Sequence, residues 1–270
     1  MKSYTLRYKK QDFRKAEVQN LRKSEIKNFD YRKSGIYQCR KDIKLNKRKI
    51  YDKITLIIVI NGRQEIKMLK KFFENVKNPK NNFGGRFMVK GMNIGHEKLA
   101  KWGRSFLNIK TSDVVLDLGC GGGRNVQYFL TKAKKVFGMD YSKTSVDIAS
   151  SVNSEAIKDG RCKIIEADVA KLPFEDESIN IVTAFETIYF WKNIEVPFRE
   201  IHRVLVKDGQ FLICNEGAYR EHKNIKKWAD MLDFEVYSPK YLTETLNKIG
   251  FKCEHHLDEK EHLVFLARKL

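Results

Sequence analysis

Three acidic residues each follow an apolar, strand-like segment, and the first of them lies beside a glycine-rich turn. Asp117 ends the run Val114–Leu116 and is followed, after one leucine, by Gly119-Cys120-Gly121-Gly122-Gly123. Glycines allow a sharp turn and let a ligand approach the backbone where a Cβ would clash. A carboxylate beside such a turn suits a positively charged amine, because it attracts an ammonium group and repels a phosphate.

The two later acids suit the other parts of a nucleoside. Asp140 ends the second strand-like segment, where it can accept hydrogen bonds from both hydroxyls of a ribose. Asp168 follows the third, where it can accept from the exocyclic amine of an adenine. Each acid also has a plain alternative: Asp140 as a helix N-cap, with Ser142 competing, and Asp168 as a turn residue. Together, the acids and the glycine turn describe a nucleoside that carries a cationic amino-acid tail.

The glycine turn by itself leaves two other interpretations open. One is a β–α turn that binds nothing. The other is a nicotinamide-dinucleotide site, whose pattern is G-x-G-x-x-G. Counted from Gly119, the third glycine of that pattern would fall where Arg124 stands. The missing glycine, together with the acid at Asp117, disfavours the dinucleotide.

Strand-like and helix-like segments alternate through residues 68–270. This alternation predicts an α/β fold with a mostly parallel sheet and helices on both faces. The expected strands are Val114–Leu116, Lys135–Met139, Lys163–Glu166, Asn180–Phe185 and Gln210–Cys214. The segments Phe251–His255 and His262–Ala267 should close the sheet as a C-terminal antiparallel hairpin.

Helices are expected between these strands. Helical spacing of apolar residues indicates two of them, with buried faces formed by Val146, Ala149, Val152 and Ala156 and by Ile194, Phe198, Ile201 and Leu205. A later helix should begin at Ser238-Pro239 and end at Gly250.

A resemblance to a known family rests on four segments, VVLDLGCGGGRN, FGMDYS, IIEADVAKLPFEDESINIVTAFETIYFW and FREIHRVLVKDGQFLICNE. In order and spacing they resemble the class I S-adenosylmethionine-dependent methyltransferases, and most closely the branch of ubiquinone- and menaquinone-biosynthesis enzymes and related small-molecule methyltransferases. The resemblance covers about residues 85–268 and implies a Rossmann-like sheet with S-adenosylmethionine as cofactor. Val206–Gln210 departs from the Lys-Pro-Gly-Gly that the family often has, in what should be a turn.

The resemblance also implies which residues hold the cofactor. The expected set is Asp117, Gly119, Cys120, Gly121, Asp140, Tyr141, Asp168 and Val169. Within it, Asp117 and Gly119 would hold the methionine end and Asp140 the ribose. Asp168 and the amide of Val169 would hold the adenine.

Candidate acceptor-side residues follow the fourth strand and precede the first. Glu186 is a candidate general base or a partner for the cofactor's ammonium group. Tyr189, Phe190 and Trp191 could wall an apolar acceptor or simply pack beneath the next helix. His96 should begin a helix over the cofactor cleft, in a functional or a structural role. We expect Glu186, His96 and Tyr189 to be catalytic, and we expect His202, His255, His256 and His262 to be structural.

No metal is expected, because the sequence contains no His/Cys/Asp cluster at ligand spacing near the cleft. The acceptor is expected to be a small molecule. The Asn-Pro-Pro-Tyr motif of amino-methylating nucleic-acid enzymes is missing at the fourth strand, and no Pro-Cys pair of the cytosine-C5 enzymes occurs. The alternative is an RNA-modifying methyltransferase that binds nucleic acid through a basic N-terminal segment.

That segment is residues 1–67, which contain 20 Lys and Arg against 7 Asp and Glu within a chain of net charge +19. Such a segment suits a nucleic-acid-binding arm, a loosely ordered extension, or translated leader sequence upstream of Met68. We expect residues 1–67 to be a basic extension and residues 68–270 to be the methyltransferase domain.

The chain is expected to be cytoplasmic. Its longest apolar run, Leu56–Ile60, is far shorter than the roughly 20 residues that span a bilayer. No secretory signal is recognisable at the N-terminus, and the odd, scattered cysteines favour reduced thiols.

Overall fold

The computed structural model describes residues 96–232 and 234–270. The predicted division at Met68 and the role of residues 1–67 lie outside the described residues. In the part that is described, no helix is both long and apolar enough to cross a membrane.

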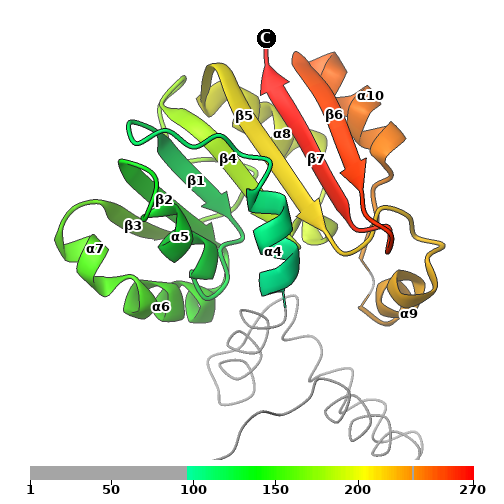
Figure 1. Ribbon diagram of the computed structural model, residues 1–270, viewed down its shortest axis with the longest axis horizontal. Helices are drawn as coiled ribbons and strands as arrows, with labels where there is room; N and C mark the ends of the chain where they lie inside the picture. Colours follow the sequence, from blue (N-terminus) through cyan, green and yellow to red (C-terminus); the bar gives the residue numbers. More distant parts are fainter. Residues whose placement is uncertain (1–95, 233) are drawn as a thin grey trace, which may run out of the picture. The chain divides into compact units, whose positions relative to one another are not determined.

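A seven-stranded sheet forms the centre of the described domain, in the order β3-β2-β1-β4-β5-β7-β6 (Figure 1). Its strands are β1 Val114–Leu118, β2 Lys135–Asp140, β3 Cys162–Glu166, β4 Ile179–Phe185, β5 Leu205–Asn215, β6 Phe251–Leu257 and β7 Leu263–Lys269. Strands β1 to β5 pair in parallel, whereas β7 pairs antiparallel with both β5 and β6. The predicted α/β class, the mostly parallel sheet and the closing hairpin are confirmed.

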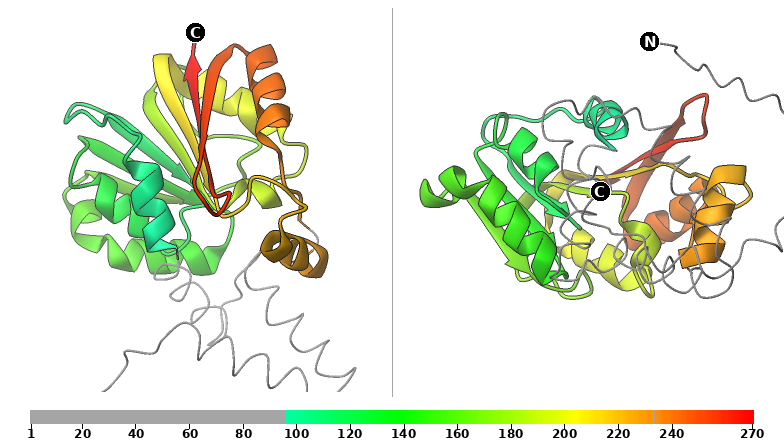
Figure 2. Two further views of the ribbon diagram at one scale, coloured as in Figure 1. Left: turned by 45° about the vertical axis from the view of Figure 1, so that its right-hand side comes forward. Right: turned by 90° about the horizontal axis from the view of Figure 1, so that it is seen from below.

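Helices cover both faces of this sheet (Figures 1 and 2). They are α4 Glu97–Arg104, α5 Arg124–Phe129, α6 Lys143–Val152, α7 Ser154–Lys158, α8 Glu195–Val204, α9 Lys223–Leu232 and α10 Pro239–Ile249, with a 3-10 helix η2 at Ile188–Phe190.

Alternating side chains of the strands separate the core into layers. In β1, Val115 packs with residues of α5 and α6 on one face, and Leu116 packs with residues of α8 and α10 on the other. This period of two is what a strand buried on both faces requires. On the first face, α4 packs Leu99 against Leu212 of β5.

The ends of α10 agree with the sequence expectation. The Ser238 hydroxyl accepts a hydrogen bond from the Tyr241 amide at 3.3 Å, and Pro239 is the first helical residue. Gly250 ends the helix in the left-handed conformation.

Two local expectations were wrong. The helix after β2 is interrupted at Asn153, whose side chain donates to the carbonyls of Gly123 and Ala149, so Val152 is 39% exposed instead of buried. The fifth strand begins earlier than expected, at Leu205. Its pairing with β4 jumps from Ile179–Leu205 to Ile181–Gln210, so the predicted turn at 206–209 is an irregularity within the strand.

Candidate functional site

The carboxyl ends of β1 to β5 bring the chemically interesting residues to one edge of the sheet. The strand order reverses between β1 and β4, and ligands of open α/β sheets bind beside such a reversal. The residues at or just beyond these strand ends are Asp117, Asp140, Asp168, Glu186 and Glu216. The cofactor-side acids therefore belong to β1, β2 and β3, and the last two belong to β4 and β5.

Asp117 is almost completely buried, at 2% exposure. Its Oδ1 accepts a hydrogen bond from the Thr183 hydroxyl of β4 at 2.7 Å. Burial raises the pKa of Asp117 to about 7, although the Thr183 hydrogen bond and the positive charge of Arg104 act in the opposite direction. A carboxylate held this far from water has a strong tendency to bind either a proton or a cationic group.

Gly119 allows the chain to leave β1 beneath Thr187. Its φ is +66°, and a Cβ at this position would lie 2.1 Å from the Thr187 hydroxyl oxygen. Both the left-handed backbone and the close contact therefore require glycine here. The turn after β1 is in this way locked to the segment that follows β4.

Gly121 differs from Gly119 in its surroundings. Its φ is +52°, but a Cβ here would meet nothing within 4 Å. Its amide donates to Asp140 Oδ2 at 2.9 Å, and the Ser142 amide donates to Asp140 Oδ1 at 2.9 Å. Burial raises the pKa of Asp140, while these backbone hydrogen bonds oppose the shift. An open backbone beside a carboxylate fits a sugar with vicinal hydroxyls. Of the two candidate N-caps, Ser142 is the one that caps α6.

The other predicted cofactor residues differ from one another in exposure and in their hydrogen bonds. The Cys120 amide donates to the Met139 carbonyl at 3.0 Å, and its thiol packs in the core, so Cys120 supports the turn more than it faces a ligand. Tyr141 is 48% exposed at the end of β2. Asp168 is exposed, and its Oδ1 accepts from the Ala170 amide at 2.9 Å, which is the turn geometry that the sequence left as an alternative. Val169 is half-buried beside it.

Folding brings His96, Glu186 and Glu216 together, which we call the acceptor-side cluster. One nitrogen or oxygen atom from each side chain lies within 4.8 Å of those of the other two. They come from the start of α4, the end of β4 and the end of β5, which Figure 1 shows to be neighbours. The expectation that no such cluster lies near the cleft is therefore corrected: these residues are far apart in sequence, and Glu216 was not among the predicted residues.

Glu186 is held firmly within this cluster. Its φ is +57°, and its carboxylate accepts the amide proton of Glu216 and the hydroxyl proton of Tyr189. Burial, and next the negative charge of Glu216, raise the pKa of Glu186 well above its usual range. Two carboxylates this close cannot both ionise without cost, so the pair favours a shared proton or a bound cation.

The aromatic residues after β4 have separate roles. The Tyr189 hydroxyl accepts the Gly217 amide proton at 3.1 Å and is almost completely buried. Trp191 packs edge-on against Phe198 in the core. Phe190 is half-buried and contacts Phe234. Of the three, only Phe190 retains substantial exposure, so it is the ring best able to wall an acceptor, whereas Tyr189 is buried against Gly217.

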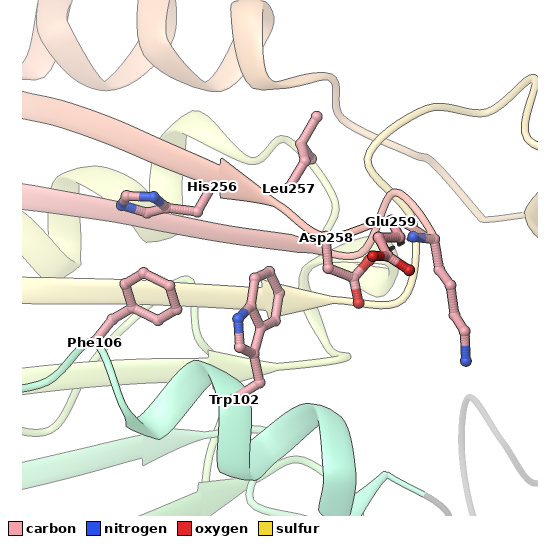
Figure 3. A pocket seen from close by; sticks show the side chains of 7 residues that line it. Trp102, Phe106, His256, Leu257, Asp258 and Glu259 are labelled. Carbon is pink, nitrogen blue, oxygen red and sulfur yellow. Dashed lines mark hydrogen bonds between the residues drawn. The ribbon is translucent and has the colours of Figure 1, made fainter.

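A separate hollow of about 550 Å³ lies between α4 and the β6–β7 hairpin (Figure 3). It is lined by Trp102, Phe106, His256, Leu257, Asp258, Glu259 and Lys260. Phe106 faces His256 at a ring separation of 4.5 Å, while Asp258 is occupied by hydrogen bonds within the hairpin turn. None of the predicted cofactor residues lines this hollow, so its size does not make it the reactive site.

We expect methyl transfer to need no metal, in spite of the acceptor-side cluster. The raised pKa of Glu186 favours its protonated form, and a protonated carboxyl group is a poor ligand for a divalent ion. Cofactor binding and turnover should therefore be unchanged after EDTA treatment and dialysis. This expectation would be contradicted if EDTA treatment abolished turnover and added Mn²⁺ or Zn²⁺ restored it while Mg²⁺ did not.

Comparisons with known proteins agree with this geometry. Residues 116–213 match the family described as methyltransferase domain. The uncharacterised methyltransferase YcgJ of Bacillus subtilis is 31% identical over 118 residues, covering 42% of this chain and 46% of that protein. The sterol 4-C-methyltransferase strm-1 of Caenorhabditis elegans is 27% identical over 193 residues, covering 67% of this chain and 58% of that protein. The chain thus spans about half the length of these curated relatives.

Solved structures share the fold. A Haloferax volcanii methyltransferase in complex with the Trm112 activator matches with a TM-score of 0.60 and 21% identity, over 67% of this chain and 92% of that one. A methyltransferase from Aquifex aeolicus matches with a TM-score of 0.56 and 16% identity, over 68% of this chain and 98% of that one.

Proposed function

Because the chain belongs to the class I S-adenosylmethionine-dependent methyltransferases, whose cofactor is S-adenosylmethionine, we propose that it methylates a small-molecule acceptor. The cofactor supplies an electrophilic methyl group on a positively charged sulfur. The observation that carries the proposal is the convergence of Asp117, Asp140 and the open backbone of Gly121 at the reversal of strand order.

Each end of the cofactor has a matching group in this arrangement. Asp117 receives the ammonium group, because its buried carboxylate otherwise lacks a full counter-charge. Asp140 receives the ribose hydroxyls, because its carboxylate lies beside the open backbone of Gly121, whose amide donates to it at 2.9 Å. Asp168 and Val169 border the adenine.

The protein's contribution to the reaction is alignment and exclusion of water. Methyl transfer is an in-line displacement, so much of its acceleration comes from fixing donor and acceptor in line. Thr187 fixes the cofactor turn relative to the end of β4, and the acceptor-side cluster begins one residue earlier, at Glu186. The turn proposed for the donor and the cluster proposed for the acceptor are therefore held by two neighbouring residues, Thr187 and Glu186.

Asp140→Asn should weaken S-adenosylmethionine binding by about 10- to 100-fold, corresponding to 1.5–3 kcal/mol for hydrogen bonds to a charged group. The amide keeps the size of the carboxylate and one acceptor oxygen, so the fold should survive. Calorimetry on the full chain measures the change, and Asp159→Asn, an exposed acid after α7, is the control. Equal affinities of the wild type and Asp140→Asn would contradict the ribose assignment.

The small-molecule acceptor is supported by the relatives, several of which are sterol methyltransferases. The alternative of an RNA-modifying enzyme depends on residues 1–67, which lie outside the described residues. We also place the protein in the cytoplasm, where a reducing environment suits the free thiols of Cys120, Cys162, Cys214 and Cys253.

A further inference from the structure

Glu216 is the member of the acceptor-side cluster that a bound acceptor can touch. Its side chain is exposed, whereas His96 and Glu186 are half-buried. It follows directly after β5, beside the strand end that carries Glu186. Asn215, immediately before it, is 1% exposed, and neither atom of its side-chain amide has a hydrogen-bond partner. The end of β5 is thus rich in polar groups that a packed core does not explain.

Glu186 is arranged to hold Glu216 in place. The backbone amide of Glu216 donates to Glu186, and Tyr189 braces the same carboxylate while accepting the amide of Gly217. Glu216 and Gly217, the two residues that follow β5, are therefore positioned by groups that follow β4. Glu186 itself already accepts two hydrogen bonds from the protein, which suits a positioning residue.

The cluster lies close to the proposed methyl donor. Thr187, the neighbour of Glu186, fills the space above Gly119. Through Thr187, the cluster is therefore adjacent to the turn proposed for the methionine end of the cofactor. A carboxylate in that position is suited to proton transfer, because general bases work within hydrogen-bonding reach of the proton that they remove.

We propose that Glu216 is the general base of the reaction, positioned by Glu186 and His96, and that the acceptor is a hydroxyl or an amine. This rests on the proposed function. As the acceptor oxygen or nitrogen forms its bond to the methyl carbon, the carbon–sulfur bond breaks and S-adenosylhomocysteine is released. The O–H or N–H bond breaks in the same process, and its proton passes to the Glu216 carboxylate. An acceptor that is already an anion needs no such residue.

Three probes with one ring system separate these cases: 2-naphthol, 2-naphthylmethylamine and 2-naphthalenethiol. The thiol ionises readily near pH 8, so it tests methyl transfer without a base. Release of S-adenosylhomocysteine is measured with the full chain, after subtraction of the rate without enzyme. Glu216→Gln should lower kcat for the naphthol or the amine about 100-fold, a typical general-base effect, and change the thiol rate less than about threefold.

The control is Glu221→Gln. Glu221 is an exposed acid in the connection between β5 and α9, and its substitution should leave all rates and pH profiles unchanged. Binding of S-adenosylhomocysteine, measured by calorimetry, should be equal in the wild type and both variants.

Two results would overturn the inference while the proposed function stands. One is a wild-type enzyme that binds the cofactor and methylates the thiol alone. The other is a Glu216→Gln variant that slows all probes equally or none. Turnover of no probe also overturns the assigned acceptor class, and the absence of cofactor binding in calorimetry would instead reject the proposed function.

Discussion

Asp117→Asn should stabilise the free protein at pH 8 and at the same time remove most of its affinity for S-adenosylmethionine. The carboxylate has a pKa of about 7, against 3.8 in a model compound. Between about pH 4 and pH 7 the folded state holds a proton that the unfolded state has released. The free energy of unfolding therefore falls as the pH rises through this range. The full penalty is about 4 kcal/mol, from 1.36 kcal/mol per pKa unit.

Urea melts at pH 8 and pH 4.5 measure the stability part of this prediction. The variant should gain up to about 4 kcal/mol at pH 8 but only about 1 kcal/mol at pH 4.5, where Asp117 of the wild type is protonated in the folded state and mostly ionised in the unfolded state. The Thr183 hydroxyl can still donate to the Asn side-chain oxygen, so packing is preserved. A gain of equal size at both pH values would show that the charge of Asp117 is not its cause.

The binding part follows from the same group. If ionised Asp117 receives the ammonium group, wild-type affinity should be highest between pH 7 and the pKa of the ligand's own ammonium group, and it should weaken about tenfold per unit below pH 7. Asp117→Asn should bind about 30- to 100-fold more weakly at pH 8, the loss of 2–3 kcal/mol from a charge-assisted contact, with little dependence on pH. Thr183→Val, which removes a hydrogen bond that lowers the pKa, should move the wild-type transition to higher pH.

Gly119→Ala should destabilise the domain by roughly 3 kcal/mol, through overpacking and a left-handed backbone at a residue with a Cβ. The new methyl group would overlap the side chain of Thr187, whose hydroxyl oxygen would be 2.1 Å away and whose Cβ would be 2.7 Å away. Thermal melts of the single variant and of the double variant Gly119→Ala/Thr187→Gly measure it. The double variant should recover the part of the loss that comes from the overlap, and a strictly additive pair would contradict this explanation.

Gly121→Ala is the matched control, because its backbone is also left-handed while its surroundings are open. It should cost only about 1 kcal/mol of stability. Its methyl group would project into the space proposed for the nucleoside, so calorimetry should show weaker cofactor binding. Affinity equal to that of the wild type would place the nucleoside elsewhere.

The cofactor half of this site could be predicted from sequence because each of its acids lies at the end of a strand. Parallel strands end at one edge of the sheet, so Asp117 and Asp140 had to be neighbours once the alternation of strands and helices was recognised. Glu216 ends β5 in the same way, and the same rule, applied to the fifth strand, would have found it.

Other features depend on contacts that no local pattern reports. His96 and Glu186 are brought together only by the packing of α4 on β5, and Gly119 meets Thr187 only because β1 and β4 are neighbours. The break between α6 and α7 depends on Asn153 reaching the carbonyl of Gly123, a contact across 30 residues. The apolar stripe predicts that Val152 is buried. Because this distant hydrogen bond ends the helix at Asn153, Val152 is instead exposed.

The extent of the shared family domain has a consequence for how this enzyme can diverge. The match to the methyltransferase domain begins at residue 116 and ends at residue 213, so it contains Asp117, Asp140 and Asp168 but neither His96 nor Glu216. The shared domain therefore includes the donor-side acids but only Glu186 of the acceptor-side cluster. An engineer who wished to exchange the acceptor could recombine the segment from residue 216 to the start of α10 between relatives and leave the donor-binding strands untouched.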